Sequence, residues 1–375
     1  MKQLPITQSN PSPGMIDLGS GNPDPDLLPI GTLKTAAERY FKSCDPRTLQ
    51  YGAEQGNGNF LGTLSGFLSP RYGFEVDPSS LLITSGASSA LDLLCTLFTR
   101  AGDVVFVEEP SYFLALRIFA DHRLKVVSLP VDDSGLQVGV VQDLFGKYRP
   151  QFIYTVPTFQ NPSGCSLSMD RRKKLVQLAQ EHDFLVIADE VYHLLGYAKA
   201  PPAPFASFSK DVAQVISINS FSKILAPGLR LGWIQAHEKI VKALAGCGLL
   251  DSGGGMNPFT SAIVDEYIES GDLDRNIHNL KLAYSTRLNA LTAALDRYIP
   301  GAEYYRPEGG FFVWVRLPGV DASKLRPRAK EAGVDFRPGA LFSSRDGLSE
   351  YIRLGFCYYS PNEIKEGVSR LGNCL

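Results

Sequence analysis

The stretch Ser220-Phe221-Ser222-Lys223-Ile224-Leu225-Ala226-Pro227-Gly228-Leu229-Arg230-Leu231-Gly232-Trp233 decides how the rest of the chain is interpreted. The apolar run Val215–Ile218 predicts a short buried strand that leads into this stretch. Lys223 would then have apolar neighbours, among which an ammonium group is costly to bury unless it is paired, neutralised or used covalently. A desolvated lysine loses its proton easily, and the free amine is a nucleophile toward carbonyl groups.

Three other side chains of this stretch are suited to binding a phosphate group. Ser220, Ser222 and Arg230 are all hydrogen-bond donors, and arginine is a strong phosphate ligand. An amine that can form a Schiff base, beside donors for a phosphate, indicates pyridoxal 5'-phosphate (PLP) as the cofactor. A surface turn that carries an ordinary solvated lysine could have the same residues, so the other motifs must decide between these interpretations.

The composition is that of a soluble globular enzyme. The 375 residues are 44% hydrophobic and 20% charged, which allows one large and one smaller domain. A formal net charge of -2 gives no support for a nucleic-acid or an anionic-membrane partner. Six scattered cysteines without a Cys-x-x-Cys pair predict reduced thiols and a cytoplasmic protein. The histidines lack metal-ligand spacing, and neither a signal peptide nor a membrane helix is expected.

From Leu81 onward, short apolar runs alternate with helical patterns. This alternation predicts an α/β fold, in which a mostly parallel sheet of seven strands lies between helices. Ligands of such sheets bind at the carboxyl ends of the strands, and this rule guides the search for a site. The expected strands are Leu81–Thr84, Val104–Val107, Lys125–Leu129, Phe152–Val156, Phe184–Ala188, Val215–Ile218 and Leu231–Gln235.

Three parts of the chain are expected from these patterns. Residues 49–270 form the large cofactor-binding domain, and residues 271–375 form a smaller α+β domain, which the N-terminal segment 1–48 joins. Asn257 is expected to cap a helix that has Pro258 at its first position.

Asp189 follows the apolar run 184–188, at the carboxyl end of a predicted buried strand. A carboxylate opposite the nitrogen of a pyridine cofactor keeps that nitrogen protonated, which makes the ring an electron sink. Tyr192, three residues later, can return to the same site and contact the phenolic oxygen of the ring. A strand-end aspartate that only caps the following turn is the alternative.

Four further positions have both a functional and a structural interpretation. Asn161 lies in the loop after another strand and offers an amide to a ring oxygen or a substrate carboxylate, although Asn-Pro-Ser-Gly is also a common turn. The segment 85–88 places backbone N–H groups at the start of a helix, where anions bind. Tyr112 could stack on a flat ring or simply pack. Arg353, in an apolar strand, suits a carboxylate ligand or a structural salt bridge.

The order of these motifs carries more information than any one of them. The chain contains, in this order, a glycine-containing anion turn, an aromatic residue, Asn-Pro-x-Gly, Asp-x-x-Tyr, Ser-x-Ser-Lys with an arginine seven residues later, and a late strand arginine. This arrangement resembles the fold-type I PLP enzymes and, among them, the class I/II aminotransferases of the aminoadipate, kynurenine and branched-chain or aromatic group. The resemblance covers nearly the whole chain, from Gly19 to the last expected helix.

The resemblance implies a role for each site residue. Lys223 would form the Schiff base with the cofactor and shuttle the proton between Cα and C4′, and Asp189 would pair with the ring nitrogen. Tyr192 and Asn161 would contact the phenolic oxygen, while Tyr112 would stack on the ring. The implied phosphate ligands are Ser220, Ser222, Arg230 and the amides of Ala87 and Ser88.

Substrate and subunit contacts are also implied by the resemblance. Arg353 would take the substrate α-carboxylate, and Gly21 matches the N-terminal segment that closes over substrate. Tyr51 would reach the phosphate from the neighbouring subunit, so a homodimer is expected. Close relatives often carry glutamine where this chain has Ser88, which affects only a detail of phosphate binding.

The expected function is transamination, which moves an amino group between an L-amino acid and a 2-oxo acid through Lys223. The same motifs would also serve a PLP-dependent lyase, decarboxylase or synthase, because they bind cofactor and carboxylate without choosing the fate of the carbanion. A non-enzymatic ligand sensor built on this fold is a further alternative. The sequence leaves the identity of the amino donor and the acceptor open.

Overall fold

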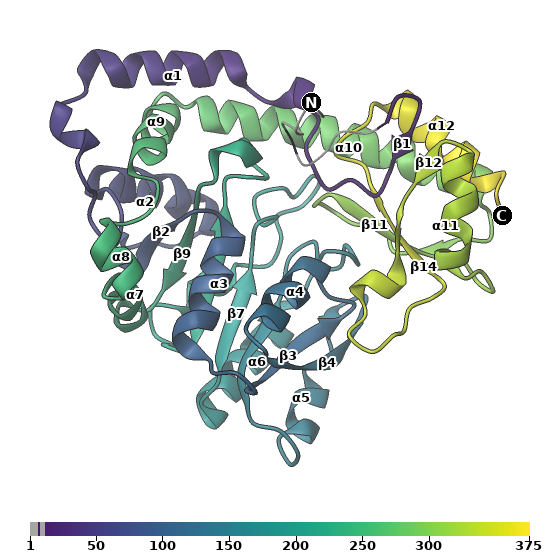
Figure 1. Cartoon of the computed structure of the whole chain (residues 1–375), viewed down its shortest axis with the longest axis horizontal. Helices are drawn as coiled ribbons and strands as arrows, with labels where there is room; N and C mark the ends of the chain where they lie inside the picture. Colours follow the sequence, from purple (N-terminus) through teal and green to yellow (C-terminus); the bar gives the residue numbers. More distant parts are fainter. Residues whose placement is uncertain (1–6, 8–11) are drawn as a thin grey trace, which may run out of the picture.

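A large sheet of eight strands forms the centre of the computed structural model, which describes residue 7 and residues 12–375 (Figure 1). All seven strands expected from the sequence are present, and the two-residue β5 is added at one edge. Only β9 and β5 run antiparallel to their neighbours, whereas the pairs β3·β4, β3·β6, β6·β7 and β7·β8 are parallel. The order in space is β2 (Leu81–Thr84), β9 (Gly232–Ala236), β8 (Val215–Ser220), β7 (Leu185–Asp189), β6 (Pro150–Thr155), β3 (Val104–Glu109), β4 (Lys125–Asp132) and β5 (Gly135–Leu136).

Both faces of this sheet are buried, which is why its strands are continuous apolar runs. Successive residues of β7 enter different hydrophobic clusters, since Ile187 packs into one and Val186 and Ala188 into the other. Helix α6 (Met169–His182) covers the second face, and α3 (Ala87–Phe98) and α4 (Phe113–Asp121) cover the first. Each buried leucine or isoleucine of these layers contributes about 1.5–3 kcal/mol to folding.

The smaller domain has its own antiparallel sheet, in the order β10 (Glu303–Tyr304), β11 (Phe312–Arg316), β14 (Tyr351–Gly355) and β13 (Arg337–Pro338). The long helix α10 (Asp272–Tyr298) packs against α12 (Pro361–Gly372), which begins with a capping box made by Ser360 and Glu363. Helix α11 (Ala322–Glu331) completes this domain on the right of Figure 1.

The N-terminal part of the chain contacts both domains. Strand β1 (Ile16–Asp17) pairs in parallel with β12 (Val334–Asp335) of the smaller domain. Helix α1 (Ile30–Ser43) instead packs on α9 (Pro258–Glu269), where the hydroxyls of Thr32 and Tyr267 are 3.1 Å apart. The domain boundaries at residues 48 and 270 stay a prediction.

The predicted cap of α9 is wrong. Pro258 is the first residue of the helix, but Asn257 has a φ of 52° and its side chain makes no capping hydrogen bond. A capping side chain needs an extended backbone, which turns its oxygen toward the first amides of the helix. In its left-handed conformation Asn257 donates instead to the hydroxyl of Ser85, at 3.3 Å, and to the carbonyl of Arg230.

The remaining helices are α2 (Gly58–Tyr72), α5 (Gly139–Leu144), α7 (Glu238–Ala245) and α8 (Gly248–Gly253). All six cysteines are free thiols. Within residue 7 and residues 12–375, none of the helices has the length and apolar character needed to cross a membrane. The same residues contain no group of three or more His, Cys, Asp and Glu side chains suited to a metal ion.

Candidate active site

Asp189 lies at the carboxyl end of β7 with one of its oxygens unused. The hydroxyl of Tyr154 donates to Oδ2 at 2.8 Å, whereas Oδ1 is buried and has no hydrogen-bond partner among the described residues. Burial raises the pKa of Asp189 to about 6, against the lowering effect of the Tyr154 hydrogen bond. A buried carboxylate with a free oxygen is a binding position for a cationic N–H group.

Lys223 faces the N-terminal segment and an aromatic ring. Its Nζ donates to the carbonyl of Gly21 at 3.1 Å and lies 5.2 Å from the ring centre of Phe311. Desolvation lowers the pKa of Lys223, and the charge of Asp189 opposes part of this effect. The two predicted residues therefore lie close enough to influence each other, and the amine is closer to its nucleophilic form than a solvated lysine.

The predicted phosphate ligands come together around the start of α3. The hydroxyls of Ser220 and Ser222 are 2.9 Å apart, and Arg230 donates to Ser222 at 3.4 Å and to the carbonyl of Ser85 at 3.1 Å. Helix α3 begins at Ala87 and has no side-chain cap. Amides of its first turn, including those of Ala87 and Ser88, lack intrahelical partners, and together with the helix dipole they are suited to binding an anion.

Gly86 fits this cradle because of its missing side chain. Its φ is +91°, and a Cβ at this position would lie 2.8 Å from Nη2 of Arg230. Any larger residue would therefore push against the arginine and strain the backbone.

The tyrosines of the site keep their hydroxyl protons. Burial raises the pKa of Tyr112 to about 12, and the charge of Asp189 adds to this shift. Burial, followed by the effect of Tyr112, raises the pKa of Tyr192 well above its usual value. Both hydroxyls are therefore hydrogen-bond donors at neutral pH. The Tyr192 ring also packs on Phe311, with 5.4 Å between the ring centres.

Arg353 is buried without a carboxylate partner among the described residues. Its Nη1 donates to Oδ1 of Asn161 and its Nη2 to the carbonyl of Gly19, both at 2.8 Å, while its Nε has no partner. The guanidinium carbon lies 3.9 Å from the ring centre of Phe312 and 4.9 Å from that of Phe342. Desolvation lowers the pKa of Arg353 to about 10, which still leaves it charged at neutral pH. The structural salt bridge considered for this residue is absent from the described part of the chain.

Of the two remaining predicted residues, Gly21 lies at the site and Tyr51 lies on the surface of the molecule. Gly21 lies at the site, since a Cβ added to it would be 3.0 Å from the Phe312 ring and 4.0 Å from Nη2 of Arg353. Tyr51 is 85% exposed, and among the described residues it makes no hydrogen bond to the side chains of this site.

Several residues that shape the site were missed from the sequence. Tyr154 lies near the carboxyl end of β6, where its ring fits the apolar pattern of the strand, so that pattern alone gives no sign of its hydrogen bond to Asp189. Gly19 acts through its backbone carbonyl, which accepts from Arg353, and a backbone group leaves no mark in the sequence. The buried Gln160 binds both Glu108, at 2.9 Å, and the carbonyl of Pro110, at 2.8 Å, and so holds the loop of Asn161. The sequence did offer one signal for Tyr154: its hydroxyl lies in an otherwise apolar strand, and the next strand of the sheet ends in the carboxylate of Asp189.

These residues together fit PLP. The free Oδ1 of Asp189 suits a protonated pyridine nitrogen, the cradle at α3 suits the phosphate, and Lys223 provides the amine. The fold and site define a PLP enzyme of fold type I.

Comparisons with known proteins identify the family. Residues 13–371 match the family described as aminotransferase class I and II. The chain is 32% identical to aromatic-amino-acid aminotransferase 1 of Thermococcus litoralis, over 96% of this chain and 88% of the relative. It is also 32% identical to the 2-aminoadipate transaminase of Thermus thermophilus, over 99% and 92%. The structure of a Pyrococcus horikoshii kynurenine aminotransferase superposes with a TM-score of 0.90 at 33% identity, covering 97% of this chain and 91% of that one. The chain belongs to the class I and II aminotransferase family and is a PLP-dependent transaminase.

Proposed function

We propose that this protein transfers an amino group between an L-amino acid and a 2-oxo acid, with Lys223 as its central catalytic residue. The observation that carries this proposal is the pairing of a desolvated lysine with a buried aspartate that keeps one oxygen free. When bound, PLP supplies an aldehyde that condenses with amines and a ring that accepts the electrons released when Cα loses its proton. Lys223 would hold the cofactor through its amine and, once freed, would serve as the base that takes the proton from Cα of the substrate.

Each of the other residues holds one part of the cofactor in this proposal. Asp189 would keep the proton on the ring nitrogen, and Tyr112 would stack on the ring. The hydroxyl of Tyr192, which keeps its proton because burial raises its pKa, would donate to the phenolic oxygen. The amide nitrogen of Asn161 would do the same, since the Oδ1 of Asn161 accepts from Arg353. The phosphate is bound by Ser220, Ser222, Arg230 and the amides of Ala87 and Ser88.

Arg353 binds the α-carboxylate of the substrate in this proposal. Its unpaired Nε and its lack of a carboxylate partner among the described residues support the assignment, since a buried guanidinium is costly without an anion. Gly21 leaves room beside Arg353 and Phe312 for the incoming amino acid. The rings of Phe312 and Phe342 lie against the Arg353 guanidinium, so they keep it in an apolar environment where a carboxylate is bound more strongly than in water.

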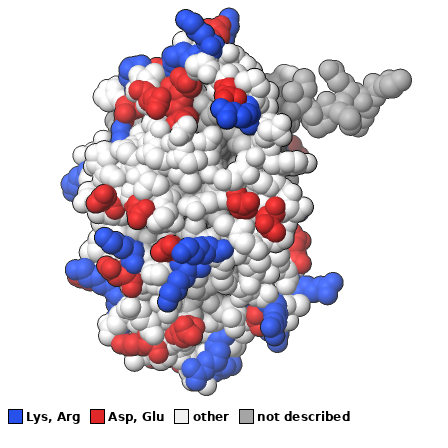
Figure 2. Space-filling model, turned by 90° about the vertical axis from the view of Figure 1, so that its left-hand side faces the viewer, with Lys and Arg blue, Asp and Glu red and all other residues white. Residues whose placement is uncertain are grey.

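We further propose a cytoplasmic homodimer in which Tyr51 reaches the phosphate of the partner subunit. Figure 2 shows the side of the molecule that carries α1, α2, α7 and α8, and a band without charged residues crosses its upper half. Monomers rarely expose so many large apolar side chains, and such patches mark interfaces. The exposed apolar residues of α1, the 49–51 loop, α3, α8 and α9 are Ile30, Phe41, Leu49, Tyr51, Leu97, Leu249 and Phe259.

A donor screen tests the reaction. The holoenzyme is mixed with L-phenylalanine, L-kynurenine, L-2-aminoadipate, L-leucine or L-alanine, each alone and then with 2-oxoglutarate or pyruvate. We expect at least one donor to convert the cofactor to pyridoxamine phosphate and to yield its own 2-oxo acid in equal amount. Release of CO₂ or loss of a side-chain group would favour a decarboxylase or lyase, and bound cofactor without any product would favour a sensor.

Mixing two inactive variants tests the shared site. In a mixed dimer of Lys223→Ala and Tyr51→Ala chains, one of the two sites has both residues intact. Random exchange should therefore restore about a quarter of the sites. A mixture that stays inactive after verified subunit exchange would refute the role of Tyr51.

A further inference from the structure

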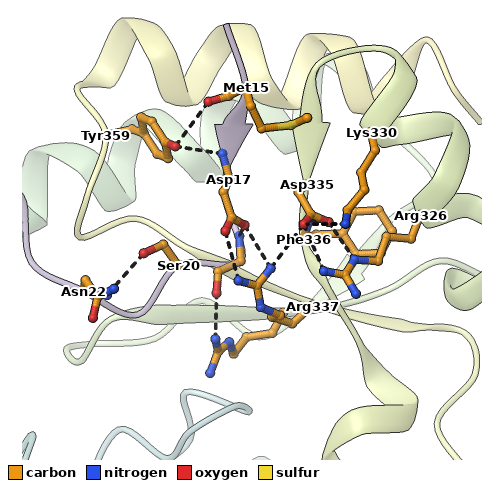
Figure 3. Close-up of polar contacts among 12 residues, drawn as sticks. Met15, Asp17, Ser20, Asn22, Arg326, Lys330, Asp335, Phe336, Arg337 and Tyr359 are labelled. Atoms are coloured by element: carbon orange, nitrogen blue, oxygen red, sulfur yellow. Dashed lines mark hydrogen bonds and ion pairs between the residues drawn. The ribbon is translucent and has the colours of Figure 1, made fainter. Parts of the chain in front are cut away.

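Opposite charges hold the N-terminal segment against the smaller domain. Nη1 and Nη2 of Arg337 donate to Oδ1 and Oδ2 of Asp17 at 3.0 and 2.9 Å, and Nη1 also approaches Oδ2 of Asp335 at 3.4 Å. Figure 3 shows Arg337 between these two carboxylates, with its guanidinium turned toward Asp17. A two-point contact of this kind fixes direction as well as distance.

This clamp is connected to Arg353 through the backbone of Gly19. Oδ1 of Asp17 also accepts from the Gly19 amide at 2.9 Å, and the Gly19 carbonyl accepts from Nη2 of Arg353 at 2.8 Å. A Cβ on Gly19 would lie 2.6 Å from Nη1 of Arg337, so the guanidinium packs directly on this peptide. A shift of Arg337 or Asp17 therefore moves the carbonyl that orients Arg353.

The two arginines also face each other across the small sheet. Strands β13 and β14 pair Arg337 with Arg353, and like charges in such positions repel. Arg337 has two carboxylate partners, whereas Arg353 has none among the described residues. The clamp thus neutralises one arginine and occupies Asp17, which leaves the other arginine available to an incoming carboxylate.

We propose that Arg337 and Asp17 are a positioning pair for the substrate carboxylate. They hold the Gly19 carbonyl in place, so that the Arg353 guanidinium keeps one orientation before substrate arrives. Neither residue touches the substrate in this arrangement. The inference rests on the proposed role of Arg353.

The fold offers a matched control for a merely structural ion pair. Arg316 donates to Glu350 and to Glu303, both at 2.9 Å, in the same small sheet, and among the described residues it makes no hydrogen bond to Asp17, Gly19 or Asp335. The backbone of the N-terminal segment is also held independently, because the Asp17 amide donates to the hydroxyl of Tyr359 at 2.8 Å (Figure 3). Loss of the clamp should therefore disturb orientation without detaching the segment.

Steady-state kinetics of the holoenzyme test the proposal, with the best donor of the screen and its 2-oxo acid acceptor. For Arg337→Gln and Asp17→Asn we expect KM for both substrates to rise about tenfold with kcat changed less than about threefold, because misorientation weakens carboxylate binding. Arg337→Lys should give a KM between those of wild type and Arg337→Gln, and Arg316→Gln should keep the wild-type KM. The Asp17→Asn/Arg337→Gln double variant should be no worse than the poorer single variant, since the pair acts as a unit.

The outcomes distinguish a failure of the positioning role of Arg337 and Asp17 from a failure of the proposed role of Arg353. Arg353→Lys measures the carboxylate site itself, and an unchanged KM there would refute the proposed role of Arg353. If Arg353→Lys raises KM while Arg337→Gln and Asp17→Asn behave like Arg316→Gln, the clamp is structural only and the inference fails. Thermal unfolding of each variant accompanies the kinetics, and Arg337→Lys and Asp17→Asn decide the question if Arg337→Gln does not fold.

Discussion

Replacing Asp189 by asparagine should stabilise the cofactor-free protein while it destroys activity. The pKa of Asp189 is about 6, against an ordinary value of 3.8, because the carboxyl is buried. Each pKa unit corresponds to about 1.4 kcal/mol, so ionisation of this group costs the folded chain about 3 kcal/mol. Asparagine has nearly the same shape, accepts the Tyr154 hydrogen bond and never ionises.

The effect has a defined pH dependence. Below pH 3.8 the carboxyl is protonated in the folded and the unfolded chain, and stability is not reduced. As the pH rises from 3.8 toward 6, the unfolded chain releases its proton first, and the loss is complete above about pH 6. The difference in unfolding free energy between Asp189→Asn and wild type should therefore grow by about 2.5 kcal/mol from pH 4 to pH 7.5.

Urea unfolding of both cofactor-free proteins across this range measures the difference. Tyr154→Phe is the companion variant, because loss of its hydroxyl removes a contribution that lowers the pKa of Asp189 and should shift the window to higher pH. Turnover of the Asp189→Asn holoenzyme should fall by about 10² or more, since the ring nitrogen loses its counter-charge. Parallel stability curves for wild type and Asp189→Asn would refute the burial argument.

Three further predictions concern other residues of the chain. Lys223→Ala should lose nearly all transamination and the absorbance of the covalently bound cofactor while it remains folded; turnover at the wild-type rate would disprove its assignment. Arg172→Met should lower the unfolding free energy by about 3–5 kcal/mol, because it strands the buried Glu190 that lies 3.5 Å from the guanidinium, and adding Glu190→Gln should recover part of the loss. Gly86→Ala should weaken PLP binding about tenfold through backbone strain and contact with Arg230, whereas Gly228→Ala, where an added Cβ meets nothing within 4 Å, should not; equal affinities in a cofactor titration would contradict the cradle.

The layout of the large domain could be predicted because its strands are buried on both faces. Continuous apolar runs such as 215–218 give a clear signal, and parallel strands bring their carboxyl ends to one edge. Asp189, Ser220 and the start of α3 are near one another for this reason, although they are far apart in the sequence. The cap of α9 could not be read in the same way, since the φ of Asn257 depends on its contacts with Ser85 and Arg230.

The sequence by itself determined the cofactor and the family, because the residue types and their order along the chain carry that chemistry. Only the tertiary structure decided which polar atoms of the site have no hydrogen-bond partner within the described chain and so can bind a ligand. Tyr154 binds Oδ2 of Asp189 and leaves Oδ1 free, while Arg337 binds Asp17, which is 320 residues away along the chain. Contacts across such separations leave no local pattern, since each partner looks like an ordinary strand or loop residue until folding brings the segments together.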